Sequence, residues 1–378
     1  MPPPATLPPM DRVDVLVVGG GAMGTAAARS LASRGRSVTV FERSEIGHVN
    51  GSSGGATRNV RLTYHDPVYV RMARAAMERW RELSDAAGVE LLRTVGGLDV
   101  GEATNASAEA LEAAGESFER PTAAEVVERW PLLRFPEAAG FLFQAEGAIV
   151  RADEAWRTQA RLATADGAVI RERTRVEKIT PRADEVEIVT ADGEVARAPA
   201  AIVAPGAWAG SLFRGVGIDL RLTPTLEQST YFQLRAEAPP LPTVIDWDAR
   251  KEPPYIVPNP FEPGEFKAGA HQSGPVVDPD TRSFDTDVER ERRVIDWVGD
   301  HLAAPAVPLR TDTCLYSTTP DDDFVLDRVG PLVIASPCSG HGFKFTPLIG
   351  EVLADLVTGA TPSFPIDRFR ADRPAVRL

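Results

Sequence analysis

The sequence predicts a protein of two parts, in which an antiparallel sheet is inserted into a parallel α/β sheet. Residues 15–18, VLVV, form a continuous apolar and mostly β-branched run, which is typical of a buried parallel strand. Residues 222–267 instead combine β-rich stretches such as STYFQL and YIVP with many prolines, which favours antiparallel strands joined by rigid turns. A buried apolar run returns at 332–335, LVIA. The chain of 378 residues is also too long for a single core.

A glycine motif follows the first strand. Gly19, Gly21 and Gly24 form GxGxxG, a helix-forming stretch follows, and a second strand over 37–41 ends at Glu42. The glycines suit a tight turn, close approach to a pyrophosphate and close packing of helix on strand, and the helix N-terminus offers N–H groups to phosphate. Glu42 stands where a carboxylate accepts hydrogen bonds from ribose hydroxyls. The motif predicts a dinucleotide site. Glu42 disfavours NADP, whose 2′-phosphate it would repel, but does not separate NAD from FAD; a ligand-free glycine turn is the alternative.

Composition limits the other classes of function. The net charge of −13 argues against nucleic acid and anionic membrane as partners. Two cysteines without a CxxC spacing predict no disulfide framework and no metal site, which fits a reducing cytoplasm. We find no apolar run of about 18 residues and expect no membrane-spanning helix. Residues 1–10 have no apolar signal-peptide core and are expected to be a disordered lead-in.

Further elements follow from periodicity and turn residues. Residues 67–87 predict an amphipathic helix, residues 190–193, TADG, a hairpin turn, and residues 285–301 a charged helix. The loop 51–55 has small side chains and is followed by two arginines, so it is either a solvated surface loop or a loop that presents cations to a ligand. The strand 201–203 leads into the small-residue turn APGAW, a second place where a ligand can approach the backbone.

Five motifs together resemble a known family. The glycine motif, TRNVRLTY, EFKAGAH, TCLYSTTPDDDFVLD and SGHGFKFTPLIGEVLADLVTG occur in the order found in the monomeric sarcosine oxidase family. That group also holds N-methyltryptophan oxidase and pipecolate oxidase, within the D-amino-acid-oxidase-like flavoproteins. The similarity covers essentially the whole chain after Asp11. It implies a Rossmann-like FAD-binding domain of parallel strands with an inserted antiparallel-sheet substrate domain. The expected FAD-binding segments are 11–90, 146–221 and 317–378, and the expected substrate-domain segments are 91–145 and 222–316.

The resemblance assigns the cofactor residues. A cysteine at the place of Cys314 carries FAD in this family through a thioether to the 8α-methyl group, although a lone cysteine in an apolar strand is by itself usually inert core. Cys338 has no such counterpart and is expected to be structural. The residues expected to bind FAD are Gly19, Gly21, Ala22, Met23, Gly24, Glu42, Arg43, Ser52, Thr57, Arg58, Val176, Gly206, Trp208, Cys314, Gly340, Gly342, Phe343 and Lys344.

The resemblance also assigns catalytic residues. Lys267 matches a lysine near flavin N5 that promotes the reaction with O2, since a fixed cation stabilises superoxide; a solvated strand lysine is the alternative. His271 matches an active-site histidine near the substrate. Arg58 matches a cation that faces the flavin, and Tyr316 a catalytic tyrosine of the pocket.

The substrate pocket is assigned in the same way. Arg61 and Lys344 match the pair of cations that binds the substrate carboxylate. Tyr64 and Tyr255 match pocket tyrosines, although the spacing from Tyr255 to Lys267 differs from the family by one residue.

The sequence departs from the family at several positions. Gly54 and Ala56 stand where sarcosine oxidases commonly carry a histidine and an aspartate, which bears on whether the flavin is attached covalently. Trp247 lies in a segment expected to approach the substrate, where it either narrows the pocket or belongs to the core.

The resemblance implies an FAD-dependent oxidase of a secondary or N-methylated amino acid that carries a free carboxylate. O2 would reoxidise the flavin to give H2O2, the imine product would hydrolyse, and the chain would be a monomer. A cyclic imino acid, such as proline, pipecolate or a piperideine carboxylate, is the alternative substrate. Two other classes remain open: an NAD-linked dehydrogenase, which would have no use for Cys314 or Lys267, and a non-catalytic flavoprotein.

Overall fold

The computed structural model describes residues 12–137, 139–235, 238–248 and 252–378. The expected lead-in over residues 1–10 lies outside the described residues. The chain divides into two compact units. Unit 1 comprises residues 1–54, 156–224 and 317–378, and unit 2 comprises residues 55–155 and 225–316. Each unit is described below by itself.

Unit 1 is built on a six-stranded sheet with the strand order β18-β19-β12-β1-β2-β8. β1 pairs in parallel with β2 and β12, so that Val15 lies opposite both Val38 and Ala200. β2 also pairs in parallel with β8, and β12 with β19, whereas β18 runs antiparallel to β19. The predicted parallel sheet is therefore confirmed. Its strands are β1 (Val15–Val18), β2 (Val38–Phe41), β8 (Val169–Arg171), β12 (Ala200–Val203), β18 (Val325–Val329) and β19 (Leu332–Ser336).

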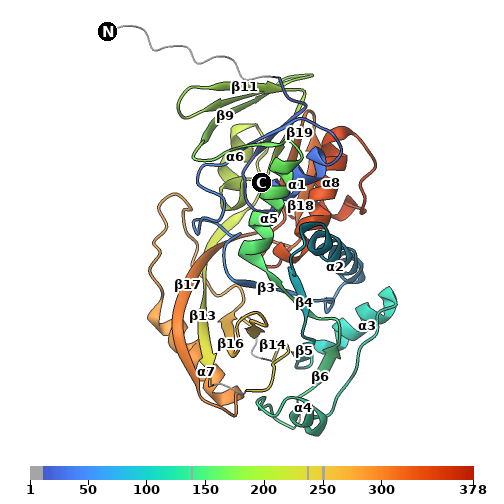
Figure 1. The fold of residues 1–378 in the computed structure, drawn as a ribbon, viewed down its shortest axis with the longest axis vertical. Helices are drawn as coiled ribbons and strands as arrows, with labels where there is room; N and C mark the ends of the chain where they lie inside the picture. The colour runs from blue at the N-terminus through green and yellow to red at the C-terminus, as the bar shows by residue number, and fades with distance from the viewer. Residues whose placement is uncertain (1–11, 138, 236–237, 249–251) are drawn as a thin grey trace. The chain divides into compact units, whose positions relative to one another are not determined.

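Two helices from opposite ends of the sequence pack together in unit 1. α1 (Ala22–Ala32) and α8 (Thr346–Thr358) lie side by side (Figure 1). They approach closely because Gly350 has no side chain: a Cβ there would lie 2.6 Å from the backbone carbon of Ala26. Arg34 Nη1 also contacts Asp355 Oδ1 at 2.6 Å. α8 is apolar on almost every side and is buried along its length, which fixes α1 against the sheet.

The remaining elements of unit 1 are short. A three-stranded sheet contains the hairpin that was predicted at residues 190–193. Its strands are β9 (Val176–Pro181), β10 (Val186–Thr190) and β11 (Val195–Ala198). The helices are η1 (Gly206–Trp208), α6 (Ala209–Gly215), η2 (Phe343–Phe345) and η3 (Asp367–Phe369), while α5 (Ala152–Ala165) runs from unit 2 into unit 1.

Unit 2 contains a seven-stranded sheet with the order β17-β13-β16-β15-β14-β5-β6. The central pairs β13–β16, β16–β15 and β15–β14 are antiparallel, as predicted, but β14 and β5 are parallel, so the sheet is mixed. Its strands are β5 (Gly97–Val100), β6 (Phe141–Gln144), β13 (Thr223–Leu234), β14 (Thr243–Asp246), β15 (Pro254–Pro258), β16 (Glu265–Ala270) and β17 (Ala306–Thr318).

A three-stranded sheet forms part of unit 2. β3 (Thr57–Val60) and β4 (Leu92–Thr94) both pair antiparallel with β7 (Ala148–Arg151). These pairings place residues 55–90, which were expected in the FAD-binding segments, in unit 2.

The helices of unit 2 begin and end at local signals. The predicted helix over 67–87 is α2 (Pro67–Ala87), capped by the Asp66 side chain and ended by Gly88 in the left-handed conformation. α3 (Thr104–Ala114) and α4 (Ala123–Arg129) follow. The predicted charged helix is α7 (Val288–His301), which begins three residues later than expected because Asp287 caps it.

One face of the large sheet is covered by α7. Val294 and Val298 of α7 share a buried apolar cluster with Phe266 and Ala268 of β16. Because side chains alternate along a strand, Lys267 and Gly269 lie on the other face. We call that other face the catalytic face, defined by Tyr231, Tyr255, Lys267 and Gly269.

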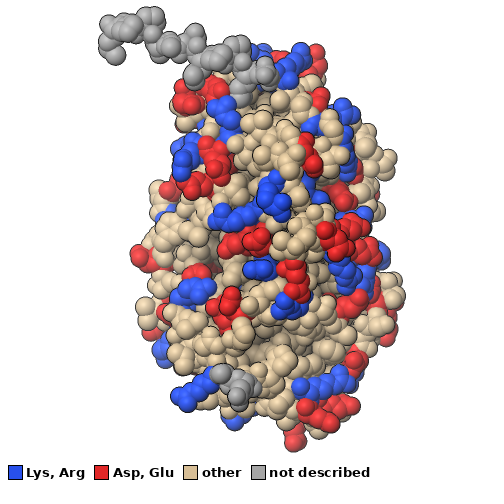
Figure 2. Space-filling model, in the orientation of Figure 1, with Lys and Arg blue, Asp and Glu red and all other residues tan. Residues whose placement is uncertain are grey.

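The surface mixes both signs of charge. Over the described residues visible in Figure 2, Lys and Arg alternate with Asp and Glu, and no broad patch of one sign forms on this side. Among the described helices, none combines the length and apolar character needed to cross a bilayer. The described residues also contain no group of three or more His, Cys, Asp and Glu side chains placed to hold a metal ion.

Candidate active site and cofactor site

The glycine motif forms a tight elbow between β1 and α1 in unit 1. Gly19 has φ of +98°, and a Cβ there would lie 2.4 Å from Ala204 O. A Cβ on Gly24 would lie 1.8 Å from Gly19 O, so only glycine lets the helix pack this close to the strand. Ala22 N donates to Ser53 Oγ at 2.9 Å, and no side chain caps the helix at Gly21. The start of α1 thus has the form of a phosphate site.

Glu42 is a buried carboxylate at the end of β2. Its two oxygens accept from Gly20 N at 2.7 Å and from Ser44 N at 2.8 Å. Burial opposes ionisation, but the hydrogen bonds from His48, Ser44 and Gly20 hold the pKa of Glu42 below its usual value. Glu42 is therefore an anion at neutral pH, in the charge state that accepts hydrogen bonds from ribose hydroxyls.

Two further turns of unit 1 carry predicted cofactor residues. The Arg43 guanidinium lies over the Trp208 ring at 4.6 Å, beside Gly206 in η1. In the turn before α8, a Cβ on Gly342 would lie 1.8 Å from Pro337 O. Lys344 in this turn is 6% exposed and donates from Nζ to His341 O at 2.7 Å. Val176 begins β9, Ser52 lies in the loop before β3, Gly340 lies in the turn before η2, and Phe343 begins η2.

In unit 2, one backbone carbonyl oxygen accepts hydrogen bonds from two cationic side chains. Thr57 O, in β3, accepts from Lys267 Nζ at 2.7 Å and from Arg58 Nη1 at 3.0 Å. Lys267 is 6% exposed. Burial first, and then the Arg58 cation, lower the pKa of Lys267 from its ordinary value of 10.5 to about 7. Lys267 therefore exchanges a proton near neutral pH, whereas an exposed strand lysine would stay charged.

Tyrosines surround this pair on the catalytic face. Tyr231 lies opposite Lys267 in the register of β13 and β16, and Tyr255 lies opposite Gly269 in that of β15 and β16. A Cβ on Gly269 would lie 2.6 Å from the Tyr255 hydroxyl, so the glycine makes room for this phenol. Burial raises the pKa of Tyr255, which keeps the phenol protonated and able to donate.

Cys314 lies on β17 in unit 2 and is a free, partly buried thiol. Burial raises its pKa, while the Arg58 and Lys267 cations lower it. The thiol thus interacts with the same two cations that share Thr57 O. Cys338 is in unit 1, where its Sγ accepts from Ser317 N at 3.3 Å, which fits the expected structural role.

His271 and Tyr316 are neighbours in unit 2. Their ring centroids are 5.7 Å apart. His271 follows the last residue of β16, and its N–H donates to Pro253 O at 3.1 Å. Burial raises the pKa of Tyr316 well above its ordinary value, and the neighbouring Tyr255 raises it further.

Arg61 is held between aromatic rings. Its guanidinium lies 4.5 Å from the Tyr64 ring and 5.6 Å from the Trp247 ring, and Nη1 donates to Thr63 Oγ1 at 3.1 Å. Stacking of this kind fixes the plane of a guanidinium while its remaining N–H groups can bind a carboxylate. Trp247, which was expected either to narrow the pocket or to be core, therefore contacts a predicted substrate residue.

The family model described as FAD dependent oxidoreductase matches residues 14–356. The chain belongs to this family. Monomeric sarcosine oxidase from Bacillus sp. (strain B-0618) is 31% identical, over 96% of this chain and 97% of that protein. N-methyl-L-tryptophan oxidase from Salmonella agona (strain SL483) is 27% identical, over 96% of this chain and 99% of that protein.

Solved structures extend the likeness. NikD, an unusual amino acid oxidase essential for nikkomycin biosynthesis, has a TM-score of 0.87 in its open form, with 26% identity over 98% of this chain and 99% of that chain. L-proline dehydrogenase from P. horikoshii has a TM-score of 0.85, with 25% identity over 97% of this chain and 98% of that chain. The expected family and fold are confirmed.

The residues of unit 1 fit FAD. The glycine elbow leaves room that a Cβ would fill, the ionised Glu42 suits a ribose, and the turns at Gly206 and Gly342 expose backbone. When bound, FAD would supply a two-electron acceptor. Membership of this family makes FAD the expected cofactor and argues against the alternative of an NAD-linked dehydrogenase.

The predicted site residues fall in both units. Arg58, Arg61, Tyr64, Tyr255, Lys267, His271, Cys314 and Tyr316 belong to unit 2 together with Thr57, and the other predicted cofactor residues, Lys344 among them, belong to unit 1. The pairing of Arg61 with Lys344 on one carboxylate stays a prediction.

Two acidic residues near this site were missed by the sequence reasoning. Asp99 in β5 is 2% exposed, and burial raises its pKa, while the Arg61 cation lowers it. Glu227 in β13 is 3% exposed and raises the pKa of Tyr316. The one available signal was an acidic residue inside an otherwise apolar or β-rich strand.

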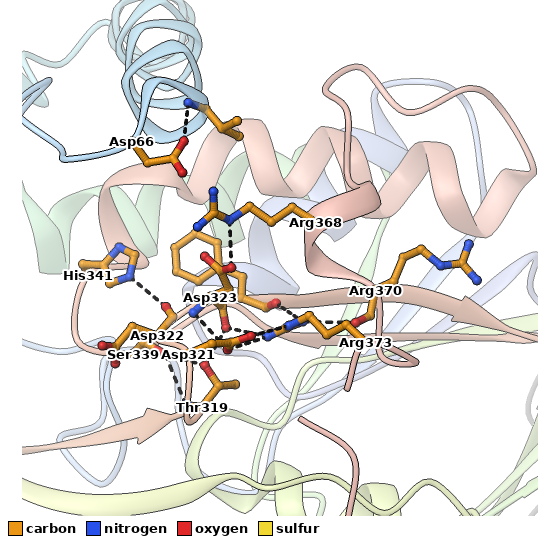
Figure 3. A network of polar contacts seen from close by, with 12 residues as sticks. Asp66, Thr319, Asp321, Asp322, Asp323, Ser339, His341, Arg368, Arg370 and Arg373 are labelled. Carbon is orange, nitrogen blue, oxygen red and sulfur yellow. Dashed lines mark hydrogen bonds and ion pairs between the residues drawn. The ribbon is translucent and has the colours of Figure 1, made fainter. Parts of the chain in front are cut away.

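Two of the three aspartates that follow Cys314 in sequence, Asp321 and Asp323, have a structural role in unit 1. Arg373 binds Asp321 through both Nε, at 2.8 Å, and Nη2, at 3.0 Å (Figure 3). Arg368 Nε binds Asp323 Oδ2 at 2.7 Å, and Thr319 Oγ1 donates to Asp323 O at 2.7 Å. These contacts join the turn before β18 to the C-terminal segment.

Proposed function

We propose that the protein oxidises the C–N bond of a secondary or N-methylated amino acid, passing a hydride equivalent to FAD and releasing an imine that hydrolyses. The observation that carries this proposal is that the buried Lys267 and the partly buried Arg58 share Thr57 O, in the same unit as the stacked Arg61. The likeness to sarcosine and N-methyl-L-tryptophan oxidases supports it.

In this proposal, each residue has a stated task. Arg61 binds the substrate carboxylate, with Lys344 as a second cation, and so orients the α-carbon. His271 holds or accepts the proton that the substrate amine gives up, because only the neutral amine can release a hydride. Lys267 stabilises the negative charge that appears on O2 as it is reduced to H2O2.

We further propose that Cys314 carries FAD covalently through a thioether. Burial raises the pKa of the Cys314 thiol, and the Arg58 and Lys267 cations offset part of this rise and so favour the thiolate. Gly54 and Ala56 stand where sarcosine oxidases commonly carry a histidine and an aspartate, so attachment here would have to proceed without those two side chains. The likeness to monomeric sarcosine oxidases supports a monomer, and the two cysteines, which form no disulfide, support a reducing cytoplasm.

A cyclic imino acid is the second candidate substrate. Trp247 beside Arg61 supports it, since a flat ring next to the carboxylate site suits a compact cyclic substrate. The structural likeness to L-proline dehydrogenase points the same way.

The first experiment is acid precipitation of the purified holoprotein. Yellow colour should stay in the pellet of wild type and of Cys338→Ala, and move to the supernatant in Cys314→Ala. Colour in the wild-type supernatant would refute covalent attachment and leave the oxidase proposal standing.

A peroxide-coupled panel then separates the substrates. Sarcosine, N-methyl-L-tryptophan, L-proline and L-pipecolate are compared with their methyl esters, which lack the carboxylate charge. Arg61→Gln should raise KM by about 10- to 100-fold for the acids, with little effect on the esters, whereas the exposed Arg292→Gln should change neither. A flavin that no amino acid reduces would support the non-catalytic flavoprotein instead.

A further inference from the structure

Besides Asp99, a second buried carboxylate of unit 2 lies next to the catalytic face. Glu227, on β13, is 3% exposed. Thr225 Oγ1 donates to its Oε1 at 2.7 Å, and Ser273 N donates to its Oε2 at 3.1 Å. Burial raises the pKa of Glu227, while Thr225 and the Arg290 cation lower it. No step of the proposed reaction uses this group.

One contact of Glu227, that with Ser273 N, is with the loop that follows His271. β16 ends at Ala270, and Gln272, with φ of +53°, turns the chain in a conformation that non-glycine residues seldom adopt. Such a turn persists only where the surroundings hold it. Ser273 supplies two such contacts, since its N–H donates to Glu227 and its Oγ donates to Ala270 O at 3.1 Å.

Arg290, in the first turn of α7, contacts both Ser273 and Glu227. It is 7% exposed. Its Nη1 donates to Leu226 O at 3.1 Å, and its Nη2 donates to Ser273 Oγ at 2.9 Å and lies 3.5 Å from Glu227 Oε2. Gly274 packs against the same strand, because a Cβ there would lie 2.1 Å from Leu226 O. One ion pair therefore clamps β13, α7 and the loop after His271.

The start of α7 is itself fixed to β13. Asp287 N donates to Gln228 Oε1 at 2.9 Å, and Gln228 Nε2 donates to Asp287 O at 3.0 Å. Arg290 thus extends from an anchored helix end. A buried ion pair adds little net stability over an apolar pair of similar size, although removing one partner alone is costly.

We propose that Glu227 and Arg290 are positioning residues, which hold the turn at Gln272 and Ser273 and so keep the His271 imidazole beside Tyr316 in the geometry that turnover needs. This inference rests on the proposed function for its kinetic consequence, but not for its structural one. Glu227 also interacts electrostatically with titratable groups on and near the catalytic face. It raises the pKa of Tyr255, Tyr316 and Cys314, whereas Arg58 lowers the pKa of all three.

The kinetic test compares variants of this clamp. Glu227→Gln should lower kcat about 10- to 100-fold, the loss expected from misplacing a catalytic group by about 1 Å, and should change KM less than about threefold, because Arg61 is untouched. Ser273→Ala, which removes the contact with Arg290, should lower kcat in the same direction by less. The matched control is Arg292→Gln, whose partner Glu289 is exposed.

The structural test does not need activity. The chain has five histidines, so a His271→Asn variant assigns the imidazole signal of His271 by its absence from the spectrum of ring-labelled holoprotein. Glu227→Gln and Ser273→Ala should shift this signal, and Arg292→Gln should not. If wild type oxidises nothing in the panel, the function proposal fails and this spectrum still decides the positioning proposal.

The result that overturns the inference is a His271 signal unchanged in both clamp variants, with kcat within about twofold of wild type even if the melting temperature falls. That outcome would make the clamp purely structural. If Glu227→Gln does not fold, Ser273→Ala and Thr225→Val decide in its place, because neither leaves an unpaired buried charge.

Discussion

The pH dependence of flavin reoxidation by O2 follows from the position of Lys267. Its amine is buried against Thr57 O and Arg58, and its pKa falls from 10.5 to about 7. We therefore expect the charged fraction of Lys267 to drop from about nine in ten at pH 6 to about one in ten at pH 8. If the cation stabilises charge on O2, the second-order rate constant of reoxidation should fall about tenfold over the same range.

Lys267→Met should remove this dependence. The variant keeps the length of the side chain but carries no charge, so its reoxidation should be about 10²- to 10³-fold slower than wild type at pH 6, with no dependence on pH from 6 to 9. Lys178→Met is the control, since Lys178 is an exposed lysine of β9 in unit 1. The measurement is stopped-flow mixing of photoreduced holoprotein with oxygenated buffer, followed by the return of flavin absorbance.

Two results would refute the reasoning. A wild-type rate constant that stays within about twofold from pH 6 to 8 would show that the titration of Lys267 does not govern reoxidation. A Lys267→Met variant within about threefold of wild type at pH 6 would show that its charge is not needed.

Three other predictions test the packing and charges described above. Because the folded pKa of Lys267 lies below the unfolded value, the unfolded chain binds more protons between about pH 7 and 10.5, so wild-type stability should rise with pH in this window; the melting-temperature advantage of Lys267→Met should be largest near pH 7 and should shrink towards pH 10. Burial raises the pKa of Asp99, so above the unfolded value of 3.8 the folded state binds more protons than the unfolded state, and wild type loses stability as pH rises. The melting temperature of Asp99→Asn relative to wild type should therefore increase from pH 4 to pH 8. A constant difference would contradict this. Gly24→Ala should place a Cβ against Gly19 O, lower stability by about 1–3 kcal/mol and reduce the flavin-to-protein absorbance ratio, whereas Ala32→Gly at the far end of the same helix should keep the flavin.

The features that sequence predicted well are those with local signals. β1, the glycine elbow and Glu42 form one contiguous stretch, in which each residue type has a separate physical reason. α2 begins and ends as predicted because Asp66 caps it, a proline follows at its first position, and Gly88 ends it. The resemblance added the residue roles, which no spacing rule would have supplied for Cys314 or Lys267.

The features that were missed depend on pairings between distant segments. β3 joins unit 2 because it pairs with β7, about ninety residues later in the chain, and nothing near residue 57 signals that partner. The parallel pairing of β14 with β5 made the sheet mixed for the same reason. Glu227 and Asp99 each look like an ordinary acid in a strand, and only burial beside Arg290 and Arg61 distinguishes them.

The way the chain passes between its units has a consequence for synthesis. Unit 2 is complete once Tyr316 has been made, whereas unit 1 needs residues 317–378, since α1 packs on α8. A chain still emerging from the ribosome therefore carries the glycine elbow without the helix that supports it. Flavin capture should be a property of the released protein, and a truncation before α8 should yield colourless protein even though every residue of unit 2 is present.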